Sequence, residues 1–158
     1  MRRFNIPNYG EITIENIIFD LNGTLQFKGK ISKELIKKIK ELKKNYNVYI
    51  VSSDIRGNLK DIAEKLGVNY IKVSSKEISE AELKNNELTK LGKDVTVTVG
   101  NGNNDSLMLK NSLLGLVIIG NEGASIESIT NSDVAFADPI CAIDFLIDEK
   151  ILIGTLRS

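Results

Sequence analysis

Three clusters of polar residues follow apolar runs that have the composition of buried strands. They are residues 20–24, 52–54 and 100–105. Carboxylates, amides, hydroxyls and free backbone N–H groups in such loops are able to hold a phosphate or a divalent cation. The chain has no histidine and a single cysteine, which excludes an intramolecular disulfide, zinc sites built on these residues and histidine-based catalysis. Any chemistry would use carboxylates, hydroxyls, lysines or a hard metal ion.

Each candidate residue also has an ordinary structural interpretation. Asp20, beside the turn at Asn22-Gly23-Thr24, could simply end its strand in an Asx-turn. Asp105 stands where the N-cap of a following helix is expected, and capping is the default role of an aspartate there. Ser52 follows a strand and could give a hydroxyl to the same anion as Asp20, but serine is common at such places. Lys84 lies on an expected helix, where a lone lysine is normally exposed.

The elements that would position these residues alternate along the chain. Short β-rich runs are separated by amphipathic helical patterns, which is typical of an α/β domain with a mostly parallel sheet. We expect strands at 12–14, 17–19, 48–51, 70–73, 95–99, 115–119 and 134–136. We expect helices at 33–44, 58–66, 81–91, 106–113, 123–129 and 140–147, with Ser32 as an N-cap and Gly67 and Gly92 as helix stops. Ligands of such sheets bind at the carboxyl ends of the strands, where the polar clusters lie.

Size and charge restrict the class of protein. The 158 residues, 42% of them apolar, fit one domain. Lysine plus arginine and aspartate plus glutamate are equal at 21 each, so no overall basic field favours nucleic acid or an anionic membrane. No apolar run approaches the roughly 20 residues that cross a bilayer, and the N-terminus has neither signal-peptide nor transit-peptide character. We expect a cytoplasmic protein without membrane insertion.

Four stretches, taken together and in order, resemble the motifs of the haloacid dehalogenase (HAD) superfamily of phosphohydrolases. They are IIFDLNGTL, VYIVSSD, Lys84 and VTVGNGNNDSLML. Within the superfamily the chain resembles the phosphorylation domain of P-type ATPases and its stand-alone soluble relatives, which carry the same Asn-Gly-Thr variant. The resemblance implies a three-layer Rossmann-like HAD-type fold with a mostly parallel central sheet. It implies a core at about 17–138, an N-terminal strand or hairpin extension over 1–16, and a C-terminal helix and tail over 139–158.

What the resemblance implies is a phosphoryl-transfer site. Asp20 would attack phosphorus to form an aspartyl phosphate, and Lys84 would neutralise the phosphoryl charge and steady Asp20. The implied catalytic residues are Asp20, Asn22 and Lys84. The implied phosphate-binding residues are Thr24, Ser52, Ser53 and Lys84. The implied ligands of Mg²⁺ are Asp20, Asn22 through its backbone carbonyl, Asn101 and Asp105.

Two positions depart from the family pattern. HAD phosphatases normally have an aspartate at Asn22, which protonates the leaving group and later activates water. Asparagine performs neither task, and general acid–base catalysis is worth about 10²–10⁴-fold, so we expect slow hydrolysis and a persistent aspartyl phosphate. The family also has a metal-binding aspartate at Asn101, and an amide oxygen there should hold a hard cation more weakly.

The spacing between the motifs leaves no room for a cap domain, so we expect an open site. An open site favours a large substrate such as a phosphoprotein, or a lid supplied by a partner protein or a second subunit, although a small phosphorylated substrate stays possible. The leading hypothesis is a magnesium-dependent HAD phosphohydrolase or phosphotransferase. The alternative is a catalytically impaired phosphate- or ion-binding regulatory module working with a partner. A weaker third hypothesis, action on a cation transporter, rests on family analogy alone.

Overall fold

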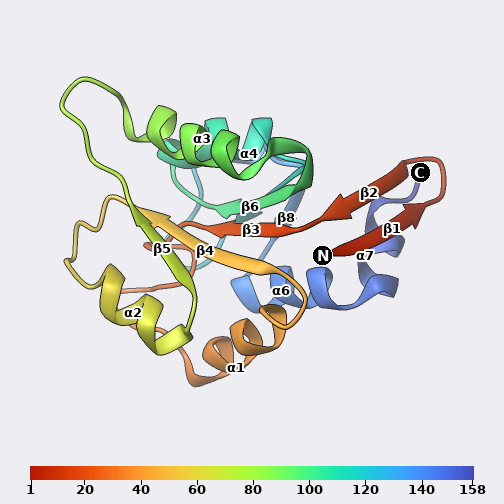
Figure 1. The fold of residues 1–158 in the computed structure, drawn as a ribbon, viewed down its shortest axis with the longest axis horizontal. Coiled ribbons are helices and arrows are strands. Elements are labelled where there is room, and N and C mark those ends of the chain that lie inside the picture. Colours follow the sequence, from red (N-terminus) through yellow and green to blue (C-terminus); the bar gives the residue numbers. More distant parts are fainter.

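The computed structural model describes all residues 1–158 and is built around one six-stranded sheet (Figure 1). The strand order is β5-β4-β3-β6-β7-β8, and every pairing within this sheet is parallel. The strands are β3 (Asn16–Phe19), β4 (Asn47–Ser52), β5 (Asn69–Lys72), β6 (Thr96–Gly100), β7 (Leu114–Ile118) and β8 (Val134–Phe136). The predicted α/β class with a mostly parallel sheet is confirmed.

Helices cover both faces of the sheet. Figure 1 shows α1 (Lys33–Leu42), α2 (Leu59–Leu66) and α6 (Pro139–Ile147) below it, and α3 (Glu80–Leu91) and α4 (Ser106–Asn111) above it. A short helix, α5 (Ile126–Thr130), packs beside α4. The connections between β3, β4 and α3 contain only α1, α2 and β5, so no cap domain is inserted.

The sheet has two apolar faces because successive strand residues point to opposite sides. In β3, Ile17 and Phe19 join a cluster of 28 buried residues, whereas Ile18 joins a smaller cluster with Leu88 and Met108 beneath α3 and α4. All four residues of β3 are buried. A strand covered on both faces is mostly apolar, and the one polar residue of β3 is Asn16, whose buried amide donates a hydrogen bond to the Leu91 carbonyl.

Several predicted helix signals are confirmed in detail. The hydroxyl of Ser32 accepts a hydrogen bond from the N–H of Leu35 and caps α1. Gly67 ends α2 in the left-handed conformation, with φ of 65°. Three predicted helices are shorter than expected by two residues or more, and the first of them, α1, ends at Leu42 rather than at residue 44. α4 ends before residues 112–113, because the N–H of Leu113 donates a hydrogen bond to the carbonyl of Thr96, the first residue of β6. α5 begins only after its N-cap, Ser125.

The two ends of the chain pack together at the amino end of the sheet. An antiparallel hairpin joins β1 (Arg2–Ile6) to β2 (Gly10–Ile14), which runs directly into β3. The predicted C-terminal helix followed by a tail was wrong in its second part, because residues Glu149–Leu156 form another helix, α7. Asp148 has a non-helical backbone and its carboxylate caps α7, so the chain restarts there as a new helix. Phe4 and Leu152 belong to the same apolar cluster as Ile17.

The single-domain boundary of 1–158 stays a prediction. None of the helices combines the length and apolar character that crossing a bilayer requires.

Candidate active site

A buried lysine connects two of the three polar loops. Lys84, on α3, is fully buried, and its Nζ lies 2.6 Å from Oδ1 of Asp20 and 2.7 Å from Oδ1 of Asp105. Asp20 directly follows β3, and its N–H bonds to Val99 of β6, which places it at the carboxyl edge of the central strands. The interpretation of Lys84 as an exposed surface lysine was therefore wrong. The structure brings Asp20, Lys84 and Asp105 together, as the resemblance predicts.

The charges in this cluster do not balance. Glu80, one turn before Lys84 on α3, approaches Nζ to 3.4 Å, so three carboxylates share one ammonium group. Burial and the neighbouring Asp105 raise the pKa of Asp20 to about 7, although Lys84 opposes the shift. Burial acts to lower the pKa of Lys84, but its ion pairs with Asp20 and Asp105 outweigh this and hold it above its usual value. The excess negative charge favours an added cation.

Asp105 is held by the backbone of its own loop. Its Oδ2 accepts hydrogen bonds from the N–H groups of Asn101 at 2.9 Å and Gly102 at 3.0 Å. The side chain makes no capping bond to α4, so the interpretation of Asp105 as an ordinary N-cap was wrong. A Cβ atom at Gly100 would lie 2.6 Å from Oδ2 of Asp105, so this close packing requires glycine. The loop therefore orients a carboxylate toward Lys84.

Thr24 and Asn101 interlock the first and third loops. The buried hydroxyl of Thr24 donates a hydrogen bond to Oδ1 of Asn101 at 3.2 Å, and the Asn101 amide donates to the Gly123 carbonyl at 3.1 Å. Gly23 has φ of 80°, and a Cβ there would overlap the Asn101 amide. Thr24 thus lies beside Asn101, and the roles of Thr24 in binding phosphate and of Asn101 in binding a metal stay predictions.

Asn22 faces the second loop through its side chain. Its Oδ1 accepts hydrogen bonds from Nε2 of Gln26 at 2.9 Å and from Nε of Arg56 at 3.2 Å. Asn58 in turn donates to Oε1 of Gln26 at 2.9 Å. Sequence reasoning missed Gln26, Arg56 and Asn58. The only signal available for Arg56 was its place two residues after the second motif, where it has no pattern of its own.

The two serines of the second loop differ in their surroundings. Ser52 is buried at the end of β4, and its hydroxyl accepts a hydrogen bond from the N–H of Asp54 at 3.1 Å. Ser53 is partly exposed and lines a small hollow of about 130 Å³ together with Glu80 and the segment before α3. No hydrogen bond joins Ser53 to Asp20 or Lys84. The phosphate-binding roles of both serines stay predictions.

The donors around Asp20 suit a hard cation. Carboxylate, amide and carbonyl oxygens are what Mg²⁺ prefers, and nitrogen or sulfur ligands are lacking. No group of three or more His, Cys, Asp or Glu side chains is arranged to hold a metal. A cation held by Asp20 and Asp105 would therefore take its remaining ligands from amides, backbone carbonyls or water, and Asn22 and Asn101 stay predicted ligands.

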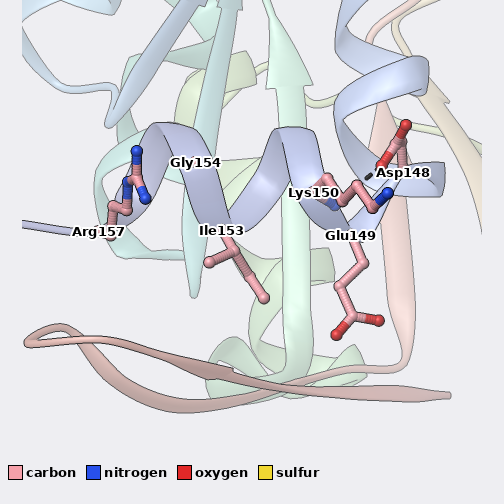
Figure 2. Close-up of a pocket in the computed structure, with 6 residues that line it drawn as sticks. All are labelled: Asp148, Glu149, Lys150, Ile153, Gly154 and Arg157. Atoms are coloured by element: carbon pink, nitrogen blue, oxygen red, sulfur yellow. Dashed lines mark hydrogen bonds between the residues drawn. The ribbon is translucent and has the colours of Figure 1, made fainter.

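The largest hollow of the molecule lies elsewhere. It has a volume of about 580 Å³ and lies against α7 (Figure 2), at the end of the molecule where the hairpin packs. Its lining residues are Asp148, Glu149, Lys150, Ile153, Gly154 and Arg157. All come from one helix and its cap, and none belongs to the three loops. We therefore place the site at Asp20 rather than in this hollow.

Two known proteins are similar to this chain in sequence. No protein-family model matches it. An uncharacterized protein of Methanocaldococcus jannaschii is 45% identical over 62 residues, which are 39% of this chain and 67% of that protein. A soluble P-type ATPase-like phosphatase of the same organism is 27% identical over 165 positions covering 100% of this chain, which spans only 58% of that phosphatase.

Solved structures match over nearly the whole chain. The 3-deoxy-D-manno-octulosonate 8-phosphate phosphatase of Moraxella catarrhalis, solved with magnesium, phosphate and KDO, has a TM-score of 0.71 at 13% identity, covering 91% of this chain and 94% of that one. The cobalt-bound deoxy-D-mannose-octulosonate 8-phosphate phosphatase of Haemophilus influenzae has a TM-score of 0.69 at 14% identity, covering 85% and 88%. At these identities the likeness establishes the fold. The chain has the fold of solved HAD-superfamily phosphatases, and its sequence is similar to that of a soluble P-type ATPase-like phosphatase.

Proposed function

We propose that the chain is a magnesium-dependent phosphohydrolase or phosphotransferase that works through an aspartyl phosphate on Asp20. One observation carries the proposal: a fully buried Lys84 ammonium bonds to Asp20 and Asp105 at once. A buried lysine between two carboxylates is costly to build for stability alone, because desolvation offsets much of the Coulomb attraction. A role in chemistry accounts for its presence.

The nucleophile is an oxygen of Asp20. Lys84 holds Oδ1 and keeps the carboxylate oriented at the carboxyl edge of the sheet, where a phosphoryl group is able to approach. The new bond forms between this carboxylate and phosphorus while the bond to the leaving group breaks. Lys84 and the hydroxyls of Thr24 and Ser52 then stabilise charge on the phosphoryl oxygens.

The proposed cofactor is Mg²⁺, held by Asp20, Asp105, the Asn22 carbonyl and Asn101. When bound, it supplies positive charge that neutralises the phosphoryl group as it transfers. The cluster around Lys84 has more carboxylates than ammonium groups, and this excess of negative charge favours binding of a cation. Asp105, fixed by two backbone N–H groups, is the most rigidly placed of these ligands.

The second half of the reaction is slow in this proposal. The Asn22 amide oxygen accepts hydrogen bonds from Gln26 and Arg56, but an amide is unable to remove a proton from water, so the usual general base is missing. The aspartyl phosphate then persists until water, another acceptor or a partner releases it.

We propose that the substrate is a phosphorylated small molecule or a phosphoprotein, and that a protein surface covers the open site. Exposed isoleucines follow three of the strands: one lies after β4, one after β5 and two after β7, the last of them at the start of α5. Ile55 is 85% exposed and Ile126 is 74% exposed, while Ile78 and Ile119 are less exposed. Such side chains around a polar centre favour a partner protein, a second copy of the chain or a large substrate.

The alternative is a regulatory module that binds phosphate or a cation without turnover. The two observations that favour it are the amides at Asn22 and Asn101, each held in hydrogen bonds to protein groups. This module would bind a phosphate analogue without forming a covalent adduct.

Intact-mass spectrometry separates these proposals. The protein is incubated with Mg²⁺ and acetyl phosphate, next to Asp20→Asn and with a parallel assay of released phosphate. The proposed function requires a phosphate adduct that depends on Asp20 and on Mg²⁺. Steady release without an adduct would show that hydrolysis is not impaired. No adduct and no release, over several donors and divalent metals, would favour the regulatory module.

A further inference from the structure

An arginine stands at the edge of the site without an acidic partner. Arg56 is exposed, its Nε donates to Oδ1 of Asn22, and none of the ion pairs in the structure includes it. Together with Ile55 and Asn22 it lines an open hollow of about 460 Å³. Its terminal guanidinium nitrogens are therefore free to bind an anion in the hollow next to Asn22, two residues from Asp20.

The turn that carries Arg56 is firmly built. Asp54 has φ of 61°, a conformation that costs energy for any residue with a side chain. It is held there because its Oδ1 accepts a hydrogen bond from the N–H of Leu59 at 2.9 Å and its Oδ2 pairs with Lys72 at 3.3 Å. The carbonyl of Asp54 also accepts from the N–H of Gly57, which closes the turn around Arg56. The turn is thus fixed by its own hydrogen bonds and by the ion pair of Asp54 with Lys72, and the guanidinium is held beside Asn22 by the bond from Nε.

Asn22 is oriented by the same contacts. Its Oδ1 receives two donors, Gln26 and Arg56, so the amide is fixed and Arg56 lies beside the position at which HAD phosphatases have an acidic residue. A leaving oxygen that receives no proton departs with a full negative charge. A guanidinium stabilises such a charge with two parallel N–H bonds and never acts as an acid itself.

We infer that Arg56 binds the leaving group, and that the site selects phosphoryl donors whose departing atom is an anionic oxygen, such as acyl phosphates and phosphoanhydrides. This inference rests on the proposed function. In the step, an Asp20 oxygen forms the bond to phosphorus and the bond from phosphorus to the leaving oxygen breaks. The electron pair of that bond stays on the leaving oxygen, which departs as a carboxylate or phosphate anion paired with Arg56. No proton is transferred.

Two donors with different leaving groups test the inference. Acetyl phosphate releases an anionic carboxylate, whereas phosphoramidate, protonated on nitrogen, releases neutral ammonia. The rate of Asp20 phosphorylation is measured with both donors by intact-mass spectrometry for the wild type, Arg56→Gln and Arg56→Lys. Arg157→Gln, directly after α7 at the other end of the molecule, is the matched control. Chemical unfolding of each variant checks that the fold is retained.

We expect Arg56→Gln to slow phosphorylation by acetyl phosphate about tenfold or more, the effect of losing a charge-assisted hydrogen bond. Phosphorylation by phosphoramidate should change less than twofold, Arg56→Lys should retain part of the acetyl phosphate rate, and Arg157→Gln should match the wild type. An equal loss with both donors, or no loss with either, would overturn the inference while leaving the proposed function intact. If neither donor phosphorylates the wild type, the proposed function fails and the inference fails with it.

Discussion

Thr24 and Asn101, which are 77 positions apart in the chain, are joined by a hydrogen bond of 3.2 Å between Oγ1 and Oδ1. This contact connects the loop that follows β3 to the loop that follows β6. The two loops carry Asp20 and Asp105, so the bond helps to set the separation of the two carboxylates. The acceptor of this bond, Asn101, is an amide at a position where HAD phosphatases have a carboxylate.

Asn101→Asp should strengthen binding of Mg²⁺. Thr24 is able to donate to a carboxylate as it does to the amide, while the added negative charge attracts a hard cation. We expect roughly tenfold tighter binding, equal to about 1.4 kcal/mol. The metal-free variant should be less stable than the wild type, because the bond to Gly123 is lost and negative charges are closer together. Isothermal titration calorimetry and urea unfolding check both effects, and unchanged affinity would remove Asn101 from the ligands.

Lys84→Met should destabilise the metal-free protein by about 3–5 kcal/mol. The substitution leaves Asp20 and Asp105 buried without their shared cation, which is the costly way to break a buried ion pair. Lys90→Met, an exposed position on the same helix, should change stability by about 0.5 kcal/mol or less. Urea unfolding gives both values. A loss at Lys84 no larger than at Lys90 would mean that the ion pairs contribute nothing to folding.

Asn22→Asp should shorten the life of the aspartyl phosphate. An aspartate accepts the same hydrogen bonds from Gln26 and Arg56, so the fold should tolerate it, and it supplies the missing general base. We expect the adduct to decay faster by about tenfold at least, with about 10⁴-fold as the upper bound of general base catalysis. The time course of the adduct mass after removal of the donor measures this rate. An unchanged lifetime would show that Asn22 does not limit hydrolysis.

Gly100→Ala should disturb the metal site through Asp105. The new methyl group would lie 2.6 Å from the Asp105 carboxylate, so that side chain must move. We expect at least about tenfold weaker Mg²⁺ binding, the equivalent of about 1.4 kcal/mol. Gly154→Ala, in α7 with open space around it, should instead stabilise the protein by roughly 0.5–1 kcal/mol, because alanine favours helix. Isothermal titration calorimetry of both variants measures the Mg²⁺ affinity. If Gly100→Ala weakened Mg²⁺ binding no more than Gly154→Ala does, the close packing at Gly100 would be contradicted.

Phe4→Ala tests whether the hairpin belongs to the folded unit. Phe4 is 1% exposed within the main apolar cluster, and Arg2 lies over its ring at 4.7 Å. Removing such a side chain from a core costs about 3–5 kcal/mol. Asn5→Ala, on the exposed side of the same strand, is the control and should change little. A small change at Phe4 would show that residues 1–16 are an appendage.

The sequence by itself determined the class of the fold and the order of the elements from β3 to α6, but not the last helix, α7. Apolar strands such as 17–19 and amphipathic helices such as 33–44 repeat locally, and their periods depend only on whether the backbone is extended or helical. The three polar loops were identifiable for the same reason, since each directly follows an apolar run.

Only the tertiary structure decided which side chains meet. Lysine is a residue type expected on the exposed face of a helix, and the residues next to Lys84 in the sequence give no sign that it is buried between Asp20 and Asp105. The contact between Asn22 and Arg56 depends on how the loops after β3 and β4 are placed by parallel pairing. Residues far apart in sequence are brought together by sheet order and packing, which are properties of the whole chain and not of any segment. For this reason the identities of candidate residues were visible in the sequence, and their partners were not.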